Sequence, residues 1–245
     1  MYDQKTVDRV ADYYDSKGPW RLTYFDQLVN TPDAELPSIL RYEKEYIVAE
    51  QNVLDTLVPQ ADRILEVGCA EGRSILGPAA AHPEKTFVGV DVAVGQLTVL
   101  HHELQRRRIK NIIPLRVSAS SIPLLDRSID LVAILNQTIG NFLGDDRRRS
   151  FEEVVRLMSD DGTLLVGGYS NVALAAEGYK AWDIKVHSID MDTGFIRLEP
   201  YNSLWQKSDK LTAELEEVGL QLAGSVEVTF GYINTYKKAT NRSSS

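Results

Sequence analysis

The sequence predicts an α/β fold built on a mostly parallel sheet, and three observations support this prediction. From Ala61 onward, short runs rich in Val, Ile and Leu alternate with amphipathic helical segments, a pattern typical of βαβ units with right-handed crossovers. The 245 residues suffice for one sizeable domain with its own core and are few for two. The content of 43% hydrophobic and 25% charged residues is typical of a soluble globule.

Residues 1–60 differ in composition from the rest and predict a helical N-terminal cap. Aromatic side chains surround a Gly-Pro break, and the apolar residues between Pro37 and Leu57 recur at helical spacing. The main domain is expected to span residues 61–239. The tail at 240–245, TNRSSS, is expected to be disordered because it is short, polar and terminal.

Five apolar runs of the main domain are expected to form its parallel strands: RILEV, TFVGVD, NIIPLRV, IDLVAIL and GTLLVGG. The amphipathic segments between them predict helices near 73–81, 94–107 and 145–158. Alternation of this kind brings the carboxyl ends of the strands to one edge of the sheet, where ligands bind.

The chain after Gly168 has a different pattern. IKVHSID and FIRLEPY flank the turn MDTG and predict a hairpin, expected to act as a lid over about 183–201. A helix is expected at about 207–218, since Gly219 stops the helical pattern. The last two runs, LAGSVEVTF and YINTYKK, are expected to close the sheet antiparallel.

Composition also limits the partners and the compartment. A net charge of -8 argues against a broad surface for nucleic acid, because such surfaces neutralise phosphates with Lys and Arg. The single cysteine, Cys69, excludes an internal disulfide and a cysteine-cluster metal site. No apolar run approaches the roughly 20 residues that span a bilayer. The expected partner is therefore a small molecule, with no nucleic acid and no membrane, in the cytoplasm; a homodimer is left open.

The stretch LEVGCAEGRS at 65–74 predicts a nucleotide-binding turn after the first strand. It lacks the dinucleotide pattern G-x-G-x-x-G, because Ala70 and Arg73 stand at the third and sixth positions counted from Gly68. Asp91 ends the next strand 19 residues after Gly72, close to the spacing of about 20 at which a carboxylate reaches ribose hydroxyls. The pattern favours a ribose and disfavours a pyrophosphate, so the predicted ligand is a nucleoside without phosphates.

At this point the chain resembles the class I S-adenosylmethionine-dependent methyltransferases. LEVGCAEGRS is similar to their first motif and FVGVDVA to their ribose-binding strand. The segments SASSIPLLDRSIDLVAIL, DDGTLLVGGYS and SLWQKSDKLTAELEEVGLQ are similar to their fourth strand, fifth strand and late helix. The resemblance covers about residues 60–238. It implies a Rossmann-like, seven-stranded fold, mostly parallel with an antiparallel final strand, and S-adenosyl-L-methionine as cofactor.

The resemblance also implies which residues bind the cofactor. Glu66 would hold the methionyl amino group, Asp91 the ribose hydroxyls, and Ala119 would lie at the adenine edge. The residues that would line the methionine and the ribose are Gly68, Cys69, Ala70 and Gly72. Val92 and Gln96 would flank the adenine.

Two positions depart from the family pattern. A simpler interpretation of the turn also competes with the cofactor-binding roles that the resemblance implies. Ser118 stands where the family commonly has an acid that accepts the adenine amino group, and Ser118 or Ser120 could substitute for it. Ala70 replaces a frequent glycine. The simpler interpretation is that the two glycines only end a strand and that Asp91 is the N-cap of a helix, a position that Asp favours.

The candidate catalytic residues are Asn136, His187 and Tyr14. Asn136 begins NQTIGNF, which follows the fourth strand and resembles the loop of enzymes that methylate amines of small metabolites. His187 lies on the hairpin and could act as a base near physiological pH, or it could be a solvated strand residue. Tyr14 belongs to an aromatic group that could enclose the acceptor or only attach the cap to the core; the others are Tyr13, Trp20, Tyr24, Phe25, Tyr179 and Trp182.

These observations predict a methyltransferase that uses S-adenosyl-L-methionine to methylate a small molecule, with an amine nitrogen as the favoured acceptor atom. No histidine and carboxylate have metal-ligand spacing, so no metal is expected. The alternatives are a protein- or RNA-directed methyltransferase and a cofactor-binding partner subunit that has lost catalysis. A nicotinamide-dependent oxidoreductase is the least favoured, because the dinucleotide pattern fails.

Overall fold

The computed structural model describes residues 4–16, 20–175, 185–199 and 201–239, and its main element is a seven-stranded sheet. The strands are β1 (Arg63–Val67), β2 (Thr86–Asp91), β3 (Ile112–Arg116), β4 (Ile129–Ile134), β5 (Met158–Tyr169), β9 (Leu220–Val228) and β10 (Gly231–Lys238). They lie in the order β3-β2-β1-β4-β5-β10-β9. Neighbours among β1 to β5 pair parallel, and β10 runs antiparallel between β5 and β9. The predicted fold class is confirmed.

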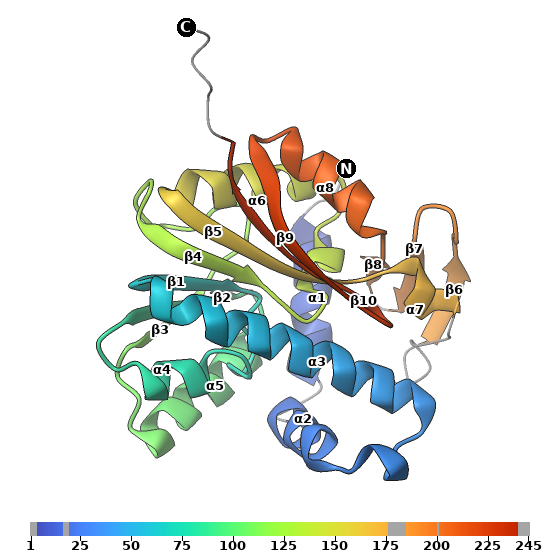
Figure 1. The fold of residues 1–245 in the computed structure, drawn as a ribbon, viewed down its shortest axis with the longest axis horizontal. Coiled ribbons are helices and arrows are strands. Elements are labelled where there is room, and N and C mark those ends of the chain that lie inside the picture. The colour runs from blue at the N-terminus through green and yellow to red at the C-terminus, as the bar shows by residue number, and fades with distance from the viewer. Residues whose placement is uncertain (1–3, 17–19, 176–184, 200, 240–245) are drawn as a thin grey trace, which may run out of the picture.

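Helices cover both faces of this sheet (Figure 1). On one face lie α3 (Ser38–Leu57), α4 (Leu76–Ala81) and α5 (Val94–Arg107); on the other lie α6 (Gly144–Leu157) and α8 (Ser208–Glu216). Strand residues alternate between the two layers: Ile64 belongs to the core on the α3 side, and the next residue, Leu65, to the core on the α6 side. Both strand faces are buried, which is why the strands of the sequence are continuous apolar runs.

The predicted N-terminal cap is helical. It comprises α1 (Gln4–Ser16), α2 (Trp20–Asn30), the short 3-10 helix η1 (Asp33–Glu35) and α3. Helix α3 begins directly after Pro37, as the spacing predicts, and it contacts β9 and β10. A second 3-10 turn, η2 (Val58–Gln60), leads from α3 into β1.

A second, three-stranded sheet follows the fifth strand. The short helix α7 (Asn171–Ala175) precedes it, and the sheet consists of β6 (Lys185–Ile189), β7 (Phe195–Glu199) and β8 (Asn202–Leu204). The predicted hairpin is present as β6 and β7, although residues 183, 184 and 200 of its expected range lie outside the described residues. The third strand was not predicted, because three residues are too few for a periodic pattern.

Two boundaries differ from the sequence prediction. Strand β5 begins at Met158, before the predicted GTLLVGG, because Met158 pairs with Ile129 across an irregularity in the β4–β5 ladder. Helix α4 begins at Leu76, since the residues from Gly68 onward first form a turn. The tail 240–245 lies outside the described residues. Within the described part of the chain, no helix is long and apolar enough to cross a membrane.

Candidate cofactor and acceptor site

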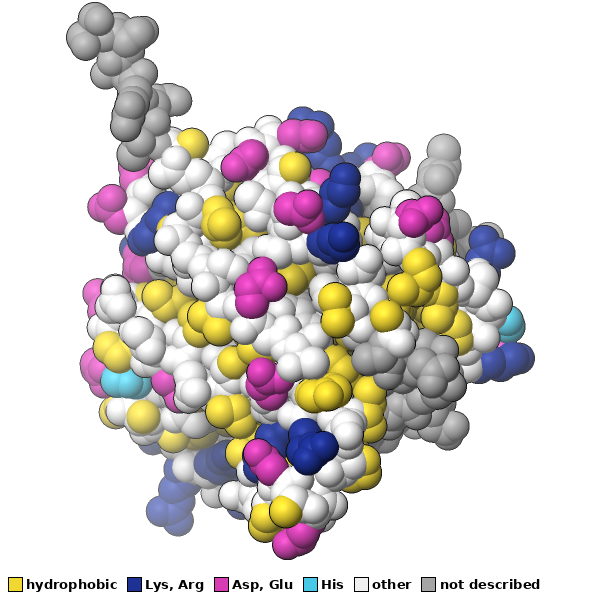
Figure 2. All heavy atoms as spheres, turned by 45° about the vertical axis from the view of Figure 1, so that its right-hand side comes forward, with side chains coloured by type: hydrophobic (Ala, Val, Ile, Leu, Met, Phe, Trp, Pro, Cys, Tyr) yellow, Lys and Arg dark blue, Asp and Glu magenta, His cyan; other side chains and the backbone are white. Residues whose placement is uncertain are grey.

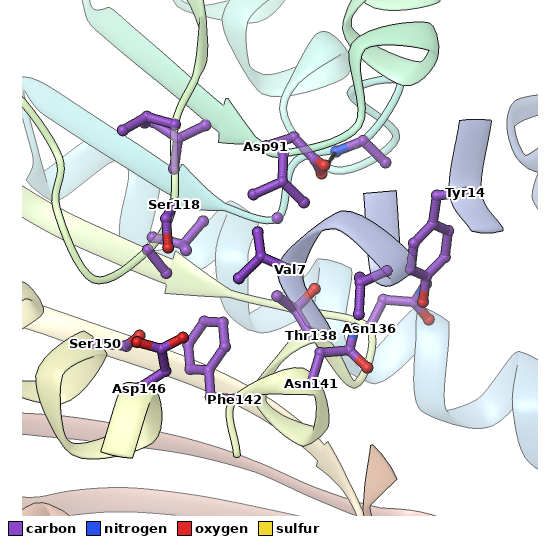
Figure 3. A pocket seen from close by; sticks show the side chains of 18 residues that line it. Val7, Tyr14, Asp91, Ser118, Asn136, Thr138, Asn141, Phe142, Asp146 and Ser150 are labelled. Atoms are coloured by element: carbon purple, nitrogen blue, oxygen red, sulfur yellow. Dashed lines mark hydrogen bonds between the residues drawn. The ribbon is translucent and has the colours of Figure 1, made fainter. Parts of the chain in front are cut away.

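A pocket opens at the carboxyl ends of β1, β2 and β4 (Figure 3). The space in it that a water-sized molecule can occupy is about 110 Å³. Eight of the predicted site residues line it: Tyr14, Gly68, Ala70, Asp91, Val92, Ser118, Ala119 and Asn136. The fold thus brings together, in one pocket, predicted residues that come from α1 and from the ends of four strands.

The glycine turn forms the floor of the pocket next to β1. Gly68 has φ +75°, and a Cβ at this position would come within 2.3 Å of the Thr138 methyl group. Only glycine fits such a conformation and approach. Ala70 also has a positive φ of 47°, a region that non-glycine residues adopt at a cost. The methyl group of Ala70 therefore does not prevent the turn.

Asp91 at the end of β2 holds this turn in place. Its Oδ2 accepts a hydrogen bond from the Ala70 amide at 2.8 Å, and its Oδ1 accepts one from the Ala93 amide at 2.9 Å. The simpler interpretation of Asp91 as a helix N-cap is wrong, because the N-cap of α5 is Ala93 and the Gly95 amide bonds to Asp15 instead. Asp91 thus connects the first two strand-to-helix turns at the pocket wall.

Four predicted cofactor residues do not line the pocket. Glu66 belongs to β1, and Cys69 and Gly72 belong to the turn: Cys69 packs against Gly89, and Gly72 lies against Leu76 and Leu100. Gln96 is buried, and its Nε2 donates to the Tyr14 carbonyl at 2.7 Å. Gln96 therefore attaches α1 to α5, a role that no local pattern indicates.

Glu66 lies behind the pocket wall and is 3% exposed. Burial raises its pKa to about 8, although the nearby Arg73 guanidinium and a hydrogen bond from Ser74 oppose this rise. Its Oε2 has no hydrogen-bond partner among the residues that the structure describes. A buried acceptor oxygen of this kind is suited to a donor such as an ammonium group.

A buried carboxylate that the sequence analysis missed, Glu50 of α3, connects the turn to the loop after β4. It is fully buried, its Oε1 accepts from the Asn136 amide at 2.6 Å, and its Oε2 accepts from Arg73 at 2.6 Å. The Tyr46 hydroxyl donates to the same Oε1 at 3.0 Å. The available signal was an acid on the apolar face of a helix, beside Ile47 and Leu54.

The loop after β4 places Asn136 at the pocket. Asn136 and Gln137 both have positive φ, 50° and 64°, before the 3-10 helix η3 (Thr138–Asn141). The Gln137 side chain fixes this conformation, because it donates to the Leu204 carbonyl at 2.8 Å and accepts from the Tyr169 amide. The predicted loop therefore faces the pocket, and Asn141 lines it as well.

Helix α1, here called the roof helix, forms the side of the pocket opposite the strands. It contributes Val7, Val10 and Tyr14 to the lining. Asp15 at its end accepts from the Gly95 amide at 2.6 Å, and a Cβ at Gly95 would come within 2.8 Å of the same oxygen. The Tyr14 hydroxyl lies 3.2 Å from that of Tyr201, so the roof helix also touches the segment beside the second sheet.

The predicted aromatic group divides into two sets. Tyr13, Tyr14 and Tyr201 form edge and tilted ring contacts at the roof. Tyr24 instead donates to Glu43, and the buried Phe25 lies under the Arg73 guanidinium, so these two attach the cap to the core. Tyr179, Trp182 and the side chain of Trp20 lie outside the described residues.

His187 lies on β6, in the second sheet. Its side chain is 44% exposed and its Nε2 is 3.3 Å from the Glu199 carboxylate. It is not among the residues that line the pocket. Its assignment as a catalytic base stays a prediction. In the described part of the chain, no group of three His, Cys, Asp or Glu side chains could hold a metal ion.

Comparison with known proteins gives the site a chemical class. Residues 64–162 match the family model of a methyltransferase domain. No curated protein sequence matches the chain. The fold is similar to the structure of the CcbJ methyltransferase from Streptomyces caelestis, with a TM-score of 0.65 and 17% identity over 98% of this chain and 100% of that one.

Two further structures share the fold. The 1,6-didemethyltoxoflavin-N1-methyltransferase of Burkholderia thailandensis, with its substrate and S-adenosylhomocysteine bound, gives a TM-score of 0.59 at 12% identity over 94% of this chain and 90% of that one. The [4+2]-cyclase SpnF gives 0.62 at 16% identity over 96% of this chain and 97% of that one.

The fold is that of the class I methyltransferases, whose cofactor is S-adenosylmethionine. The resemblance predicted from the sequence is confirmed, because residues 64–162 match the methyltransferase model and the fold is shared with these enzymes. The residues present fit this cofactor: the turn at Gly68 and Ala70 has no room for a larger side chain at Gly68, and the buried Glu66 keeps one oxygen without a partner in the described structure.

Proposed function

We propose that the protein transfers a methyl group from S-adenosylmethionine to a small-molecule acceptor, at a nitrogen atom. The observation that carries the proposal is the roof helix, whose Val7, Val10 and Tyr14 line the same pocket as the glycine turn and Asp91. An acceptor that meets the cofactor in this pocket must fit beneath a helix. A small molecule fits such a space more readily than a folded macromolecule.

The cofactor would supply an electrophilic methyl group on a sulfonium sulfur. We assign the ribose hydroxyls to Asp91, the methionyl part to the turn at Gly68 and Ala70, and the adenine to the apolar end with Val92 and Ala119. Asn136 and Tyr14 would then lie at the methyl end, opposite Ser118 (Figure 3). Their part in the reaction is to orient the acceptor and exclude water, and positioning of this kind can lower the barrier considerably.

The pocket lining favours nitrogen as the acceptor atom. Among the described residues that line it there is no His, Lys or Cys; the titratable side chains are Tyr14, Asp91 and Asp146. Asp91 is assigned to the ribose, and Asp146 lies at the other end. A neutral amine or a ring nitrogen attacks with its own lone pair, so it needs no protein base before the transfer.

Charge supports a small acceptor over protein or RNA. The chain carries a net charge of -8, and acidic and basic side chains lie interspersed on the face shown in Figure 2. A macromolecule-directed enzyme of the RNA type would need a concentrated basic surface beside the pocket mouth. The likeness to the methyltransferase from Burkholderia thailandensis, whose structure holds 1,6-didemethyltoxoflavin, supports a small-molecule acceptor.

A second candidate function is cofactor binding without methyl transfer. The observation that favours it is the likeness to SpnF, a protein of this fold described as a [4+2]-cyclase. In that case the chain would bind S-adenosylmethionine and give no methylated product. The cofactor site would be intact, so binding measurements alone do not separate the two functions.

One experiment separates them. The protein is incubated with methyl-labelled S-adenosylmethionine and three panels: small amines, phenols and N-heterocycles; unstructured peptides; and RNA. We expect S-adenosylhomocysteine and a methylated product only with members of the first panel, and with nitrogen compounds above phenols. Asp91→Ala serves as the control for cofactor-dependent signal. Transfer to peptide or RNA alone would contradict the proposal, and tight cofactor binding with no product in any panel would favour the second candidate.

A further inference from the structure

The residues that recognise the adenine edge of the cofactor are not given by the family resemblance, because the position that would hold an acid is Ser118. Its hydroxyl already lies 3.0 Å from that of Ser120, and the Ser120 amide donates weakly to it at 3.4 Å. Ser120 does not line the pocket. The two serines that could substitute for the acid are thus largely engaged with each other.

Another carboxylate lies in the same part of the pocket. Asp146, in the first turn of α6, lines the pocket together with Ser150 one turn further on. In Figure 3 the side chains of Ser118, Asp146 and Ser150 gather on one side of Asp91, and Tyr14 and Asn136 lie on the other. Of the described residues that line the pocket, Asp91 and Asp146 are the two carboxylates, and Asp91 is bonded to the turn.

The helix dipole favours an acid such as Asp146 in the first turn of α6, but no described group fixes the direction of its carboxylate. It forms no hydrogen bond or ion pair with any described residue, and no side chain caps α6. The neighbouring Arg147 pairs with Glu214 at 2.5 Å rather than with Asp146. A half-buried carboxylate without a partner in the described structure is available to accept a hydrogen bond from a ligand in the pocket.

The adenine ring supplies such a donor. Its faces are apolar and suit the valine and alanine side chains of this end, and Phe142 lies in the lining beside them. Its edge carries an amino group with two N–H donors and ring nitrogens that accept. A carboxylate can accept from the amino group in a charge-assisted hydrogen bond, which is stronger than one to a serine hydroxyl.

We propose that Asp146 of α6 accepts the hydrogen bond of the adenine amino group, in place of an acid at position 118, and so determines the specificity of the site for adenine. The proposal rests on the cofactor assignment and is independent of the identity of the methyl acceptor.

The test is a comparison of two ligands on matched variants. S-Adenosylhomocysteine and its 6-oxo analogue, S-inosylhomocysteine, are titrated calorimetrically into the wild type, Asp146→Asn and Asp145→Asn. Asp145 lies in the same helical turn, is exposed and does not line the pocket, so it controls for the charge at the helix N-terminus. A carboxylate attracts the amino group and repels the 6-oxo group, whereas an asparagine amide can serve either.

We expect the wild type and Asp145→Asn to prefer the adenosyl ligand by about 10- to 100-fold, the range for a hydrogen bond to a charged group. In Asp146→Asn this preference should fall to within about threefold, mainly through weaker binding of the adenosyl ligand. Asp146→Ser repeats the test with a side chain of another shape, and thermal unfolding without ligand shows that the variants fold. An unchanged preference in both Asp146 variants would overturn the proposal, and so would the same loss in Asp145→Asn.

Discussion

The two sides of the pocket are built differently. The strand side is fixed by bonds that reach into the buried core: Asp91 holds the Ala70 amide, and Glu50 joins Asn136 to Arg73. The roof helix is attached through Asp15, the Tyr14 carbonyl and the Tyr14 hydroxyl. We expect the strand side to be the rigid side, which would hold the cofactor, and the roof helix to be the side that moves when ligands enter and leave.

The largest effect should come from removing the buried carboxylate of the rigid side. Glu50→Ala removes the fully buried partner of the partly buried Arg73, and breaking a buried pair costs about 3–5 kcal/mol of the free energy of unfolding. Urea unfolding measures this loss. The matched control is Glu152→Ala, which breaks the exposed Arg148–Glu152 pair and should cost at most about 1 kcal/mol. Equal losses of unfolding free energy in the two variants would show that the buried Glu50 pair does not stabilise this side of the pocket.

The buried Glu66 should make the stability of the rigid side depend on pH. Its pKa in the folded protein is about 8, above its ordinary value of 4.5, so the folded state binds the proton more tightly. This contribution to stability is complete below about pH 4.5 and is lost as the pH rises through about 8, with a slope of up to about 1.4 kcal/mol per pH unit.

The measurement is urea unfolding of the wild type and of Glu66→Gln without ligand over this pH range. The glutamine variant lacks the titration but keeps the shape, so other groups contribute equally to both proteins. We expect the wild type to lose stability relative to Glu66→Gln toward higher pH. Parallel pH profiles for the two proteins would mean that Glu66 titrates normally.

A smaller effect is expected at the roof. Asp15→Ala removes the carboxylate that accepts from the Gly95 amide at the start of α5, and loss of such a cap costs about 1 kcal/mol. We expect faster amide hydrogen exchange across residues 4–16 and faster release of S-adenosylhomocysteine, with little change in global unfolding. Asp12→Ala, at an exposed position on the same helix, is the control. Unchanged exchange in Asp15→Ala would show that the roof helix is held by other contacts.

The smallest effect is expected at His187. Its side chain is exposed and paired with Glu199, so His187→Ala should change neither the free energy of unfolding nor the affinity for S-adenosylhomocysteine measurably. The informative quantity is turnover with an acceptor found in the panel experiment. A rate equal to that of the wild type would remove His187 from the candidate catalytic residues, whereas a large loss would support its predicted role as a base.

The same comparison explains how far the sequence could predict this molecule. The strands of the seven-stranded sheet, their alternation with helices, and the turn with Asp91 depend on local patterns, and the sequence analysis found them. Glu50 was missed, and the bond of Gln96 to α1 was not foreseen, because these roles arise from contacts with Asn136 and Tyr14, 86 and 82 residues away along the chain. No local pattern encodes a partner at that distance. Cys69 and Gly72 were placed at the ligand because the turn motif does not tell which of its residues face the pocket.

The most direct test concerns Asp91, because the whole assignment of the pocket depends on a ribose at the end of β2. Calorimetric titration of S-adenosylhomocysteine compares the wild type with Asp91→Ala and with Asp130→Ala. Asp130 accepts hydrogen bonds from Arg63 and nearby amides at the opposite edge of the same sheet. Asp130→Ala therefore removes a similar set of hydrogen bonds far from the pocket. We expect Asp91→Ala to weaken binding by about 1–3 kcal/mol and Asp130→Ala to leave it unchanged. Wild-type affinity in Asp91→Ala would contradict the assignment of the cofactor site.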